Sequence, residues 1–305
     1  MPSPFASSTC WSTWPTCCST RGCAMARPAL RPGAAARAAW LLLALAWLGG
    51  LVAAALLAPW LGLPDPAGAA DFAELSVPPS PAHWLGTDDV GRDLLSRVIW
   101  GTRISLTVGL GATLIGLLAG GALGLTAGYL RGRYEQAVLW LLDVILSFPP
   151  LVAALTISAV LGPSLANVTL AIAFIKVPAF ARVTRAATLL HAQREFVLAA
   201  HSLGASHGDV LLRELLPNVL LAILGYALTN VAVAIATEGA LAFLGLSVPP
   251  PAASWGALIA QGRPVLAEAP HVALIPALVM FVTVLTLNLI GDAWHRRFDT
   301  RGAVL

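Results

Sequence analysis

Polar side chains inside the apolar segments of this chain are the first candidates for chemistry. Four of them lie within or beside long apolar runs: Lys176, Glu238, Asn288 and Asp292. A charge near the centre of a membrane helix costs about 2.5–3.5 kcal/mol on insertion scales. Such residues therefore usually face a bundle interior or a water-filled cavity. We predict that Glu238 and Asn288 lie on an internal pathway or at a subunit interface.

Structural roles are the alternatives for these side chains. Glu238 is equally well suited to be a hydrogen-bond partner for a neighbouring helix. Asp292 stands close to Trp294 at the end of an apolar run, so we expect it at the boundary with water. Lys176 either reaches toward the interface or pairs with another side chain, and the sequence assigns it no role.

Motifs for covalent or metal chemistry are missing from the sequence. It has no G-x-x-x-x-G-K-[ST] phosphate loop, no H-E-x-x-H zinc helix and no G-x-S-x-G elbow. The histidines are scattered, mostly in predicted loops: His83, His191, His201, His207, His271 and His295. The cysteines all lie near the N-terminus: Cys10, Cys17, Cys18 and Cys23. Their spacing is compatible with a metal knuckle or with a disulfide knot. We expect that this chain is not an enzyme, has no metal site and binds no cofactor.

A polar, helix-forming hairpin interrupts the apolar body at residues 195–217, which read EFVLAAHSLGASHGDVLLRELLP. Phe196, Ala199, Ala200 and Leu203 recur at helical spacing and are predicted to share one face. The alanines keep that face shallow, so that another surface can approach closely. This pattern predicts a helix that inserts into a groove of a partner protein. An amphipathic helix that rests on the lipid surface is the alternative.

The rest of the hairpin carries signals for a turn and a second helix. Gly204 can adopt the left-handed conformation that ends a helix. Ser206 and Asp209 have the S-x-x-D spacing that caps a following helix. Pro217 is predicted in the first turn of the next apolar span, where its missing N–H group costs little.

The composition indicates a membrane protein. Of the 305 residues, 58% are hydrophobic and only 11% are charged, whereas about 25% is usual for a soluble domain. A span needs roughly 20 apolar residues to cross about 30 Å of hydrocarbon. Six such spans are predicted, at residues 38–58, 104–130, 136–161, 167–190, 218–246 and 272–294. Internal prolines in the third and fourth spans are expected to be tolerated, because neighbouring helices satisfy the freed backbone groups.

The distribution of arginine predicts the orientation. Basic side chains gather at both termini, after the second span and around the hairpin: Arg27, Arg31, Arg37, Arg131, Arg133, Arg182, Arg185, Arg194, Arg213, Arg296, Arg297 and Arg301. The opposite side has fewer: Arg92, Arg97, Arg103 and Arg263. Both termini and the hairpin are therefore predicted to be cytoplasmic. The net charge of +3 is too small to indicate nucleic-acid binding.

The remaining segments complete the predicted organisation. Residues 1–37 form a cytoplasmic tail, of which 1–24 are hypothesised to be an overlapping-frame translation upstream of a start at Met25. The first span and an outer segment occupy 38–103, with an amphipathic helix on the outer interface before the second span. Residues 104–294 form the core, which includes a short outer loop with Trp255 as an interfacial anchor, and 295–305 are a cytoplasmic tail.

The hairpin resembles the EAA loop in the membrane subunits of binding-protein-dependent ABC importers. Five residues fall in register with that motif: Ala199, Ala200, Gly204, Leu216 and Pro217. Glu195 and Phe196 match the acidic-aromatic pair that precedes it in peptide transporters. Leu198 replaces the glutamate of the motif, which removes one polar contact to the ATPase that the resemblance implies.

Further motifs, in the right order, are similar to the C-type permease of dipeptide and oligopeptide importers. They are HWLGTDDVGRDLLSR with GTRISL, DVILSFP, FLGLSVPPP with SWG, LNLIGD and a terminal DTR. Thr300 replaces the usual proline of the last motif. The resemblance implies an all-α polytopic protein with six transmembrane helices, the type I ABC importer (MetI-like) permease fold, in the bacterial inner membrane.

The resemblance also implies a function and partners. The chain is expected to move peptides or related small solutes by alternating access. Its implied partners are a homologous B-type permease, two ABC ATPases that bind ATP and magnesium, an extracytoplasmic binding protein and membrane lipid, but no nucleic acid. The implied ATPase-coupling residues are Glu195, Phe196, Ala199, Ala200, Gly204, Ser206, Asp209, Leu216 and Pro217. A nickel-chelate or glutathione importer of the same family, or a stand-alone ion-coupled transporter, is the alternative.

Overall fold

The computed structural model describes residues 34–60, 62–66, 68 and 71–302, with side chains only between 39 and 296 of these ranges. The four cysteines and the hypothesis about residues 1–24 fall outside the described residues. The chain divides into two units between Ala39 and Trp40. The fold below is that of the second unit, which begins within the first described helix.

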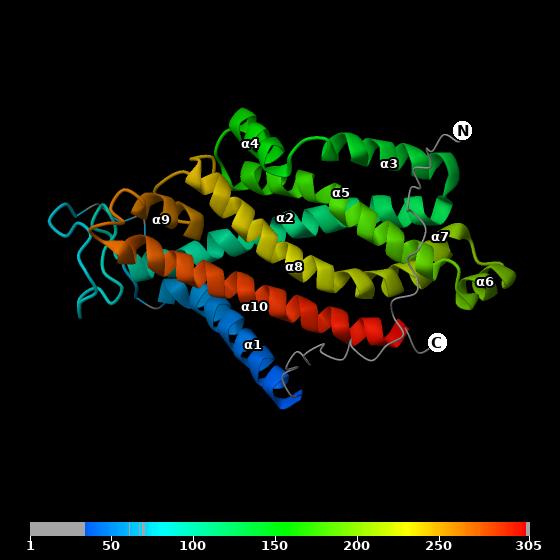
Figure 1. Ribbon diagram of the computed structural model, residues 1–305, viewed down its shortest axis with the longest axis horizontal. Coiled ribbons are helices and arrows are strands. Elements are labelled where there is room, and N and C mark those ends of the chain that lie inside the picture. The colour runs from blue at the N-terminus through cyan, green and yellow to red at the C-terminus, as the bar shows by residue number, and fades with distance from the viewer. Residues whose placement is uncertain (1–33, 61, 67, 69–70, 303–305) are drawn as a thin grey trace, which may run out of the picture. The chain divides into compact units, whose positions relative to one another are not determined.

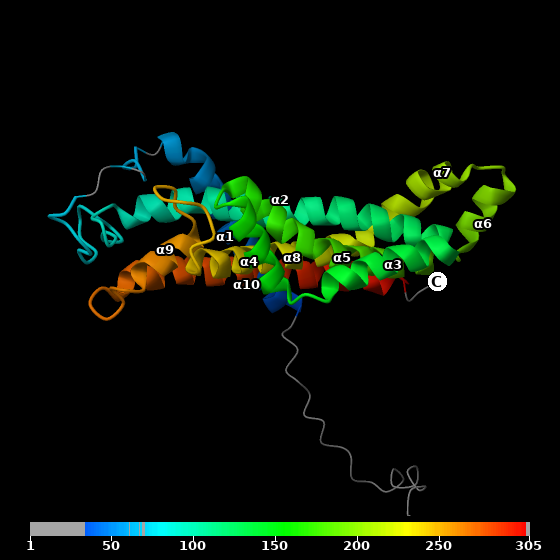
Figure 2. The same cartoon turned by 90° about the horizontal axis from the view of Figure 1, so that it is seen from above.

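The described chain is helical almost throughout (Figure 1). Its longer helices are α1 (Ala34–Leu57), α2 (Leu94–Leu130), α3 (Gly132–Leu146), α4 (Pro150–Leu161), α5 (Leu165–His191), α8 (Leu216–Phe243) and α10 (Pro270–Gly302). Short elements are η1 (Ala58–Trp60), α6 (Glu195–Ser202), α7 (His207–Asp209), the π-helical η2 (Val210–Leu215) and α9 (Trp255–Gly262). Within the second unit, α9 and the segment before α2 lie at one end, and α6 and α7 lie at the opposite end (Figure 2).

The third predicted span is broken. Among the described residues, five helices are long and apolar enough to cross a membrane, and α3 with α4 makes a sixth span only if the bent pair is counted as one. The pair bends by 80° at the break, where Pro149 precedes α4 and Pro150 begins it. Proline lacks an N–H group and clashes with the preceding turn, so two in succession end α3. The prediction that one continuous helix tolerates them was wrong.

The second span begins earlier than predicted. The amphipathic segment before Ile104 is not a separate interfacial helix, because α2 runs unbroken through it for 37 residues. Asp93 caps this helix by accepting a 2.8 Å hydrogen bond from the backbone N–H of Ser96. The predicted boundary between residues 103 and 104 therefore falls inside a helix.

A stripe of glycines joins α2 to α5. Gly116, Gly120, Gly124 and Gly128 recur at every fourth position and are all buried. A Cβ atom added at Gly124 would overlap the backbone carbonyl oxygen of Ala181. The two helices therefore touch backbone to backbone, the arrangement that small residues at four-residue spacing allow in membranes.

Trp255 is a core residue and not the predicted interfacial anchor. Its side chain is fully buried, and its indole N–H donates a 3.1 Å hydrogen bond to the carbonyl of Val98. Its backbone N–H donates to the hydroxyl of Ser105, also at 3.1 Å. The missing side chain of Gly101 makes room for the indole ring. This tryptophan therefore attaches the predicted outer loop, which contains α9, to the start of α2.

Candidate functional site

The hairpin is folded as a helix, a turn and a helix. Gly204 follows α6 with φ at +82°, the left-handed conformation expected of a glycine that ends a helix. The Ser206 hydroxyl accepts a 3.2 Å hydrogen bond from the backbone N–H of Asp209, as the capping pattern predicts. It also donates to the Asp209 carboxylate at 2.6 Å. The predicted turn and cap are confirmed.

The second helix of the hairpin is not a separate element. It continues from α7 through the π-helical turn η2 into α8, so that His207–Phe243 is one helix of 37 residues. Pro217 lies in the first turn of α8, as predicted. π-helical turns are frequent at functional sites. The second half of the hairpin and the fifth span are therefore one continuous helix.

The predicted shared face of the hairpin is divided in two. Phe196 and Ala200 pack against a buried cluster between the hairpin, α2 and the start of α8, which the sequence did not predict. Its buried members are Leu125, Val197, Val210, Leu215 and Val219. Ala199 is exposed, and the side chain of Leu203 is 89% exposed. The surface free for a partner is thus formed by Ala199 and Leu203, next to the exposed Leu198.

Tyr129 attaches the hairpin to α2. Its hydroxyl lies 2.7 Å from Nδ1 of His207 and 3.2 Å from Nε2 of His201. The two histidines lie on either side of the hairpin turn, so one phenol fixes both of its helices. No local pattern could have indicated this contact, because the partners lie more than 70 residues apart.

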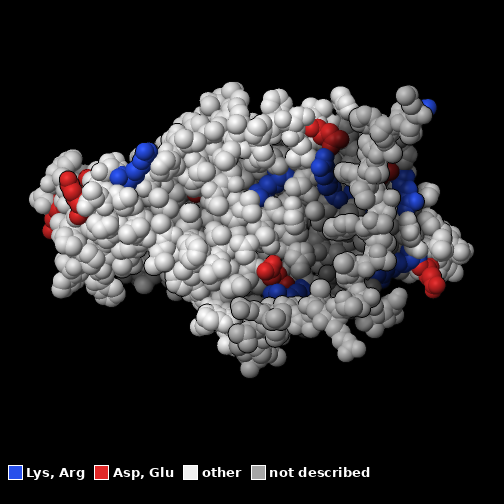
Figure 3. Space-filling model, in the orientation of Figure 1, with Lys and Arg blue, Asp and Glu red and all other residues white. Residues whose placement is uncertain are grey.

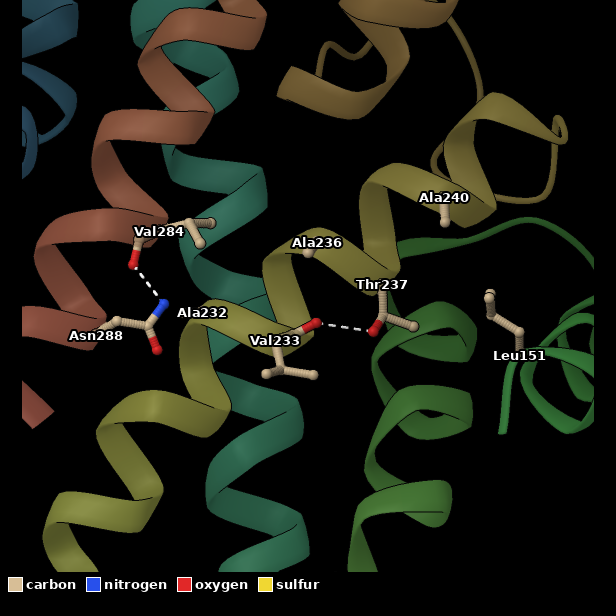
Figure 4. Close-up of a pocket in the computed structure, with 8 residues that line it drawn as sticks. All are labelled: Leu151, Ala232, Val233, Ala236, Thr237, Ala240, Val284 and Asn288. Atoms are coloured by element: carbon tan, nitrogen blue, oxygen red, sulfur yellow. Dashed lines mark hydrogen bonds between the residues drawn. The ribbon is translucent and has the colours of Figure 1, made fainter. Parts of the chain in front are cut away.

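An apolar cavity of about 290 Å³ opens between α4, α8 and α10 (Figure 4). It is lined by Leu151, Ala232, Val233, Ala236, Thr237, Ala240, Val284 and Asn288. Thr237 donates its hydroxyl hydrogen to Val233, and Asn288 donates its amide to Val284 at 2.9 Å. Both polar side chains thus bond to carbonyls of their own helices. Asn288 lines this cavity, whereas Glu238 does not.

Glu238 holds the loop that follows α8. Its side chain is fully buried, and one carboxylate oxygen accepts hydrogen bonds from the hydroxyls of Ser247, at 2.5 Å, and Ser254, at 2.7 Å. Ser254 in turn caps α9. The structure therefore places Glu238 as an acceptor for the loop that carries α9, and its role in a pathway or an interface stays a prediction.

Lys176 is buried in the middle of α5, with 5% of its surface exposed. Its ammonium group donates a 3.0 Å hydrogen bond to the side-chain oxygen of Asn230 on α8. It forms no ion pair within the part of the chain that the structure describes. Of the two possibilities left open by the sequence, the structure shows pairing.

The segment before α2 is fixed by buried charge. Arg97 is fully buried and forms an ion pair with Asp88, and it donates a 3.0 Å hydrogen bond to Gln261 of α9. Both ring nitrogens of His83 contact carboxylates at 3.0 Å, those of Asp93 and Glu74. The hydrogen bond to Asp93, with a further one to Glu74, raises the pKa of His83 against the opposing effect of its partial burial.

On the face shown in Figure 3, charged side chains lie at the left-hand end and again from the centre toward the opposite end, with an uncharged band between the two groups. Together with the apolar spans, such a band is typical of a surface that faces lipid.

Comparisons with known proteins agree with this architecture. The model of a family described as binding-protein-dependent transport system inner membrane component matches residues 113–303. The glutathione transport system permease protein GsiD of Pectobacterium atrosepticum is 39% identical over 251 residues, covering 82% of this chain and 83% of the relative. GsiD of Escherichia coli O157:H7 shows the same identity and coverage.

Solved structures show the same fold. A chain of the inward-facing MetNI methionine ABC transporter matches with a TM-score of 0.57 and 16% identity, covering 67% of this chain and 97% of that one. A chain of an amino acid ABC transporter with histidines matches with a TM-score of 0.51 and 20% identity, covering 67% and 94%. This protein therefore belongs to the inner membrane components of binding-protein-dependent transport systems, and it is a non-catalytic permease subunit of an ABC importer.

Proposed function

We propose that this permease pairs with a homologous permease subunit and that two ATPase subunits bind the pair at their hairpins. An extracytoplasmic binding protein delivers the substrate from the other side. ATP and magnesium are bound by the ATPases, and this chain binds no cofactor. The sequence supports ATP binding by other subunits, because it has no phosphate loop of its own.

The exposed apolar surface of the hairpin is the observation that carries the ATPase contact. Leu198 and Ala199 lie on α6 and Leu203 follows its last residue; α6 packs through Val197 on a cluster shared with α2 and α8, and nothing in the described chain covers the three exposed residues. An exposed apolar patch on a rigid helix is suited to insertion into a groove. Leu198 in the place of the glutamate adds apolar area to this surface where the family has a polar contact.

We propose carboxylate-bearing peptides or related small solutes as substrates. The support comes from the relatives at 39% identity, whose printed names state glutathione transport. Closure of the ATPases moves the hairpin and thereby α8, and the importer alternates between inward- and outward-facing states. Each state must be favoured by contacts that the other lacks, because only such differences shift the equilibrium.

Substitution on the exposed side of the hairpin tests this proposal. Leu203→Asp combined with Ala199→Asp is expected to abolish co-purification of the ATPase and ATP-driven uptake while the protein still inserts. Ala200 is unsuitable for this purpose, because it packs against the core of the hairpin. Leu244→Asp is the matched control, since Leu244 is also exposed but lies at the other end of α8.

Two results would contradict the proposal. Unchanged ATPase binding by the double variant would remove the docking role from this surface. Uptake by liposomes that contain only this chain would show a stand-alone transporter instead.

A further inference from the structure

Lys176 is the only lysine in the chain, and every other strongly basic side chain is an arginine. It lies in the middle of α5 and is buried against both α2 and α8. On the α2 side its Cβ packs over Gly116, where an added Cβ would approach it to 3.0 Å. On the α8 side its ammonium group meets Asn230. A flexible cation is thus enclosed at the junction of three spans.

The partner of this lysine is oriented to receive it. The Asn230 amide donates a 3.0 Å hydrogen bond to the carbonyl of Tyr226, which directs its oxygen toward Lys176. An ammonium group has three donors, and among the residues that the structure describes only this one neutral oxygen accepts from it. The site therefore holds a basic group in place and offers it no counter-charge from the described residues.

The Lys176–Asn230 pair lies next to the cavity between α4, α8 and α10. Asn230 precedes Val233 and Thr237 on α8 by three and seven residues, so these three side chains lie on the same side of the helix. Val233 and Thr237 line the cavity (Figure 4). Asn230 lies on the hairpin side of the cavity, because it comes two residues before Ala232, the first residue of α8 that lines it.

We propose that Lys176, held by Asn230, binds the carboxylate group of the transported substrate when α5 and α8 separate during the transport cycle. A buried cation without a counter-charge favours an anion that enters its surroundings. A lysine presents a compact point charge that binds one carboxylate oxygen at a time, and it does not clamp both as an arginine would. A transport site must release its ligand in each cycle, so a contact to one carboxylate oxygen suits it better than a contact to both. The inference rests on the proposed function, from which it takes a carboxylate-bearing substrate.

Chemical modification tests the site directly, because an amine reagent has a single lysine target in this chain. The assembled importer in lipid nanodiscs is treated with formaldehyde and a mild reductant, and mass spectrometry follows dimethylation of Lys176. We expect glutathione to slow this modification at least threefold. Glutathione diethyl ester is the matched control, since it has the same amine and thiol but no carboxylate, and it is expected to give no protection.

Variants test the consequence for transport. Lys176→Met keeps the length of the side chain and removes a buried charge, so it should insert at least as well as the wild type. We expect it to lower ATP-driven glutathione uptake at least tenfold while the ATPase still co-purifies. Lys176→Arg is expected to keep the preference for carboxylates but to turn over more slowly.

The outcomes separate this inference from its alternatives. Equal protection by glutathione and its ester, or wild-type uptake by Lys176→Met, would overturn it. Modification that is slow in the importer and fast in the isolated chain, whatever the ligand, would also overturn it, because the partner permease and not the substrate would then cover the site. If the wild-type importer shows no ATP-driven uptake, the proposed function fails, whereas protection of Lys176 by glutathione can still be measured.

Discussion

Single buried side chains hold the outer segment against the spans. Arg97 connects three parts of the chain, because it lies on α2, pairs with Asp88 in the preceding segment and bonds to Gln261 on α9. Asp88 also accepts backbone hydrogen bonds from Val90 and Arg92. Removing one member of such a pair leaves the other charge buried and uncompensated.

Arg97→Met is therefore expected to lower the stability of the protein by about 3–5 kcal/mol, the usual cost of breaking a buried ion pair. Thermal unfolding in detergent measures the change. Arg182→Gln is the control, because Arg182 forms an exposed pair with Asp143 and such pairs contribute at most about 1 kcal/mol. Equal shifts for the two variants would contradict this account of Arg97.

The bridging histidine predicts a dependence on pH. His83 is held in its charged form by Asp93 and Glu74, so its pKa in the folded protein lies above the ordinary value of about 6.5. Its stabilising contribution is complete below that value and is lost as the pH rises through the raised pKa. As the pH rises through this pKa, the unfolding temperature of the wild type should fall toward that of His83→Gln. If the unfolding temperatures of the two proteins change in parallel with pH, His83 is not held by Asp93 and Glu74 as described.

Features of single residues that depend on close neighbours in the sequence could be predicted. The φ angle of Gly204 and the cap at Ser206 follow from neighbours a few residues away, and both were predicted. Trp255 was misplaced because its partner, Val98, lies 157 residues away in the sequence. The contacts of Tyr129 with the hairpin were missed for the same reason.

The packing of α2 against α5 depends on glycines, which have no side chain to separate the two helices. Gly120 and Gly124 face backbone atoms of α5 so closely that a methyl group has no room. The carbonyl groups that it would meet belong to a helix and cannot move independently. This interface is thus specified by the four-residue repeat of glycine.

Gly124→Ala is expected to destabilise the protein by about 1–3 kcal/mol or more, the usual effect of overpacking. Gly50→Ala in α1 is the matched control, because no atom lies within 4 Å of an added Cβ there. The control should be neutral or slightly stabilising, since alanine favours helix by up to about 1 kcal/mol over glycine. Unfolding temperatures and yields from membranes measure both, and a neutral Gly124→Ala would contradict the close packing.

The apolar segments predicted the positions of the membrane helices better than the points at which these helices begin or bend. The six apolar segments all correspond to helices, yet the start of α2 and the bend between α3 and α4 were missed. The sequence did indicate a helix before Ile104, but the charges of Arg97 and Arg103 favoured a separate interfacial helix over the first turns of α2. The pair Pro149–Pro150 did carry a signal for a break, which the expectation of internal prolines in membrane helices overrode.

At the scale of the whole molecule, the six-span topology requires the bent pair of α3 and α4 to cross the membrane once. Residues 24–305 contain no cysteine. Single cysteines can therefore report sidedness once the four N-terminal ones are replaced by serine. Suitable exposed positions flank the spans at both ends: Ala82, Arg133, Pro163 and Ser202.

An impermeant maleimide applied to intact spheroplasts is expected to label Ala82→Cys and Pro163→Cys. Arg133→Cys and Ser202→Cys should react only after permeabilisation, because the arginine distribution places them in the cytoplasm. Labelling of positions 133 and 163 from the same side would show that α3 and α4 form a re-entrant hairpin. The six-span topology would then be wrong.

The unbroken helix from His207 to Phe243 has a mechanical consequence. Its 37 residues make a beam roughly 55 Å long at about 1.5 Å per residue. If such a lever pivots near its midpoint, a tilt of about 10° displaces each tip by roughly 5 Å in opposite directions. A displacement of the hairpin end by the proposed ATPases would then produce an opposite displacement of the other end of the helix, near Phe243. No relay of side chains is needed to carry it there.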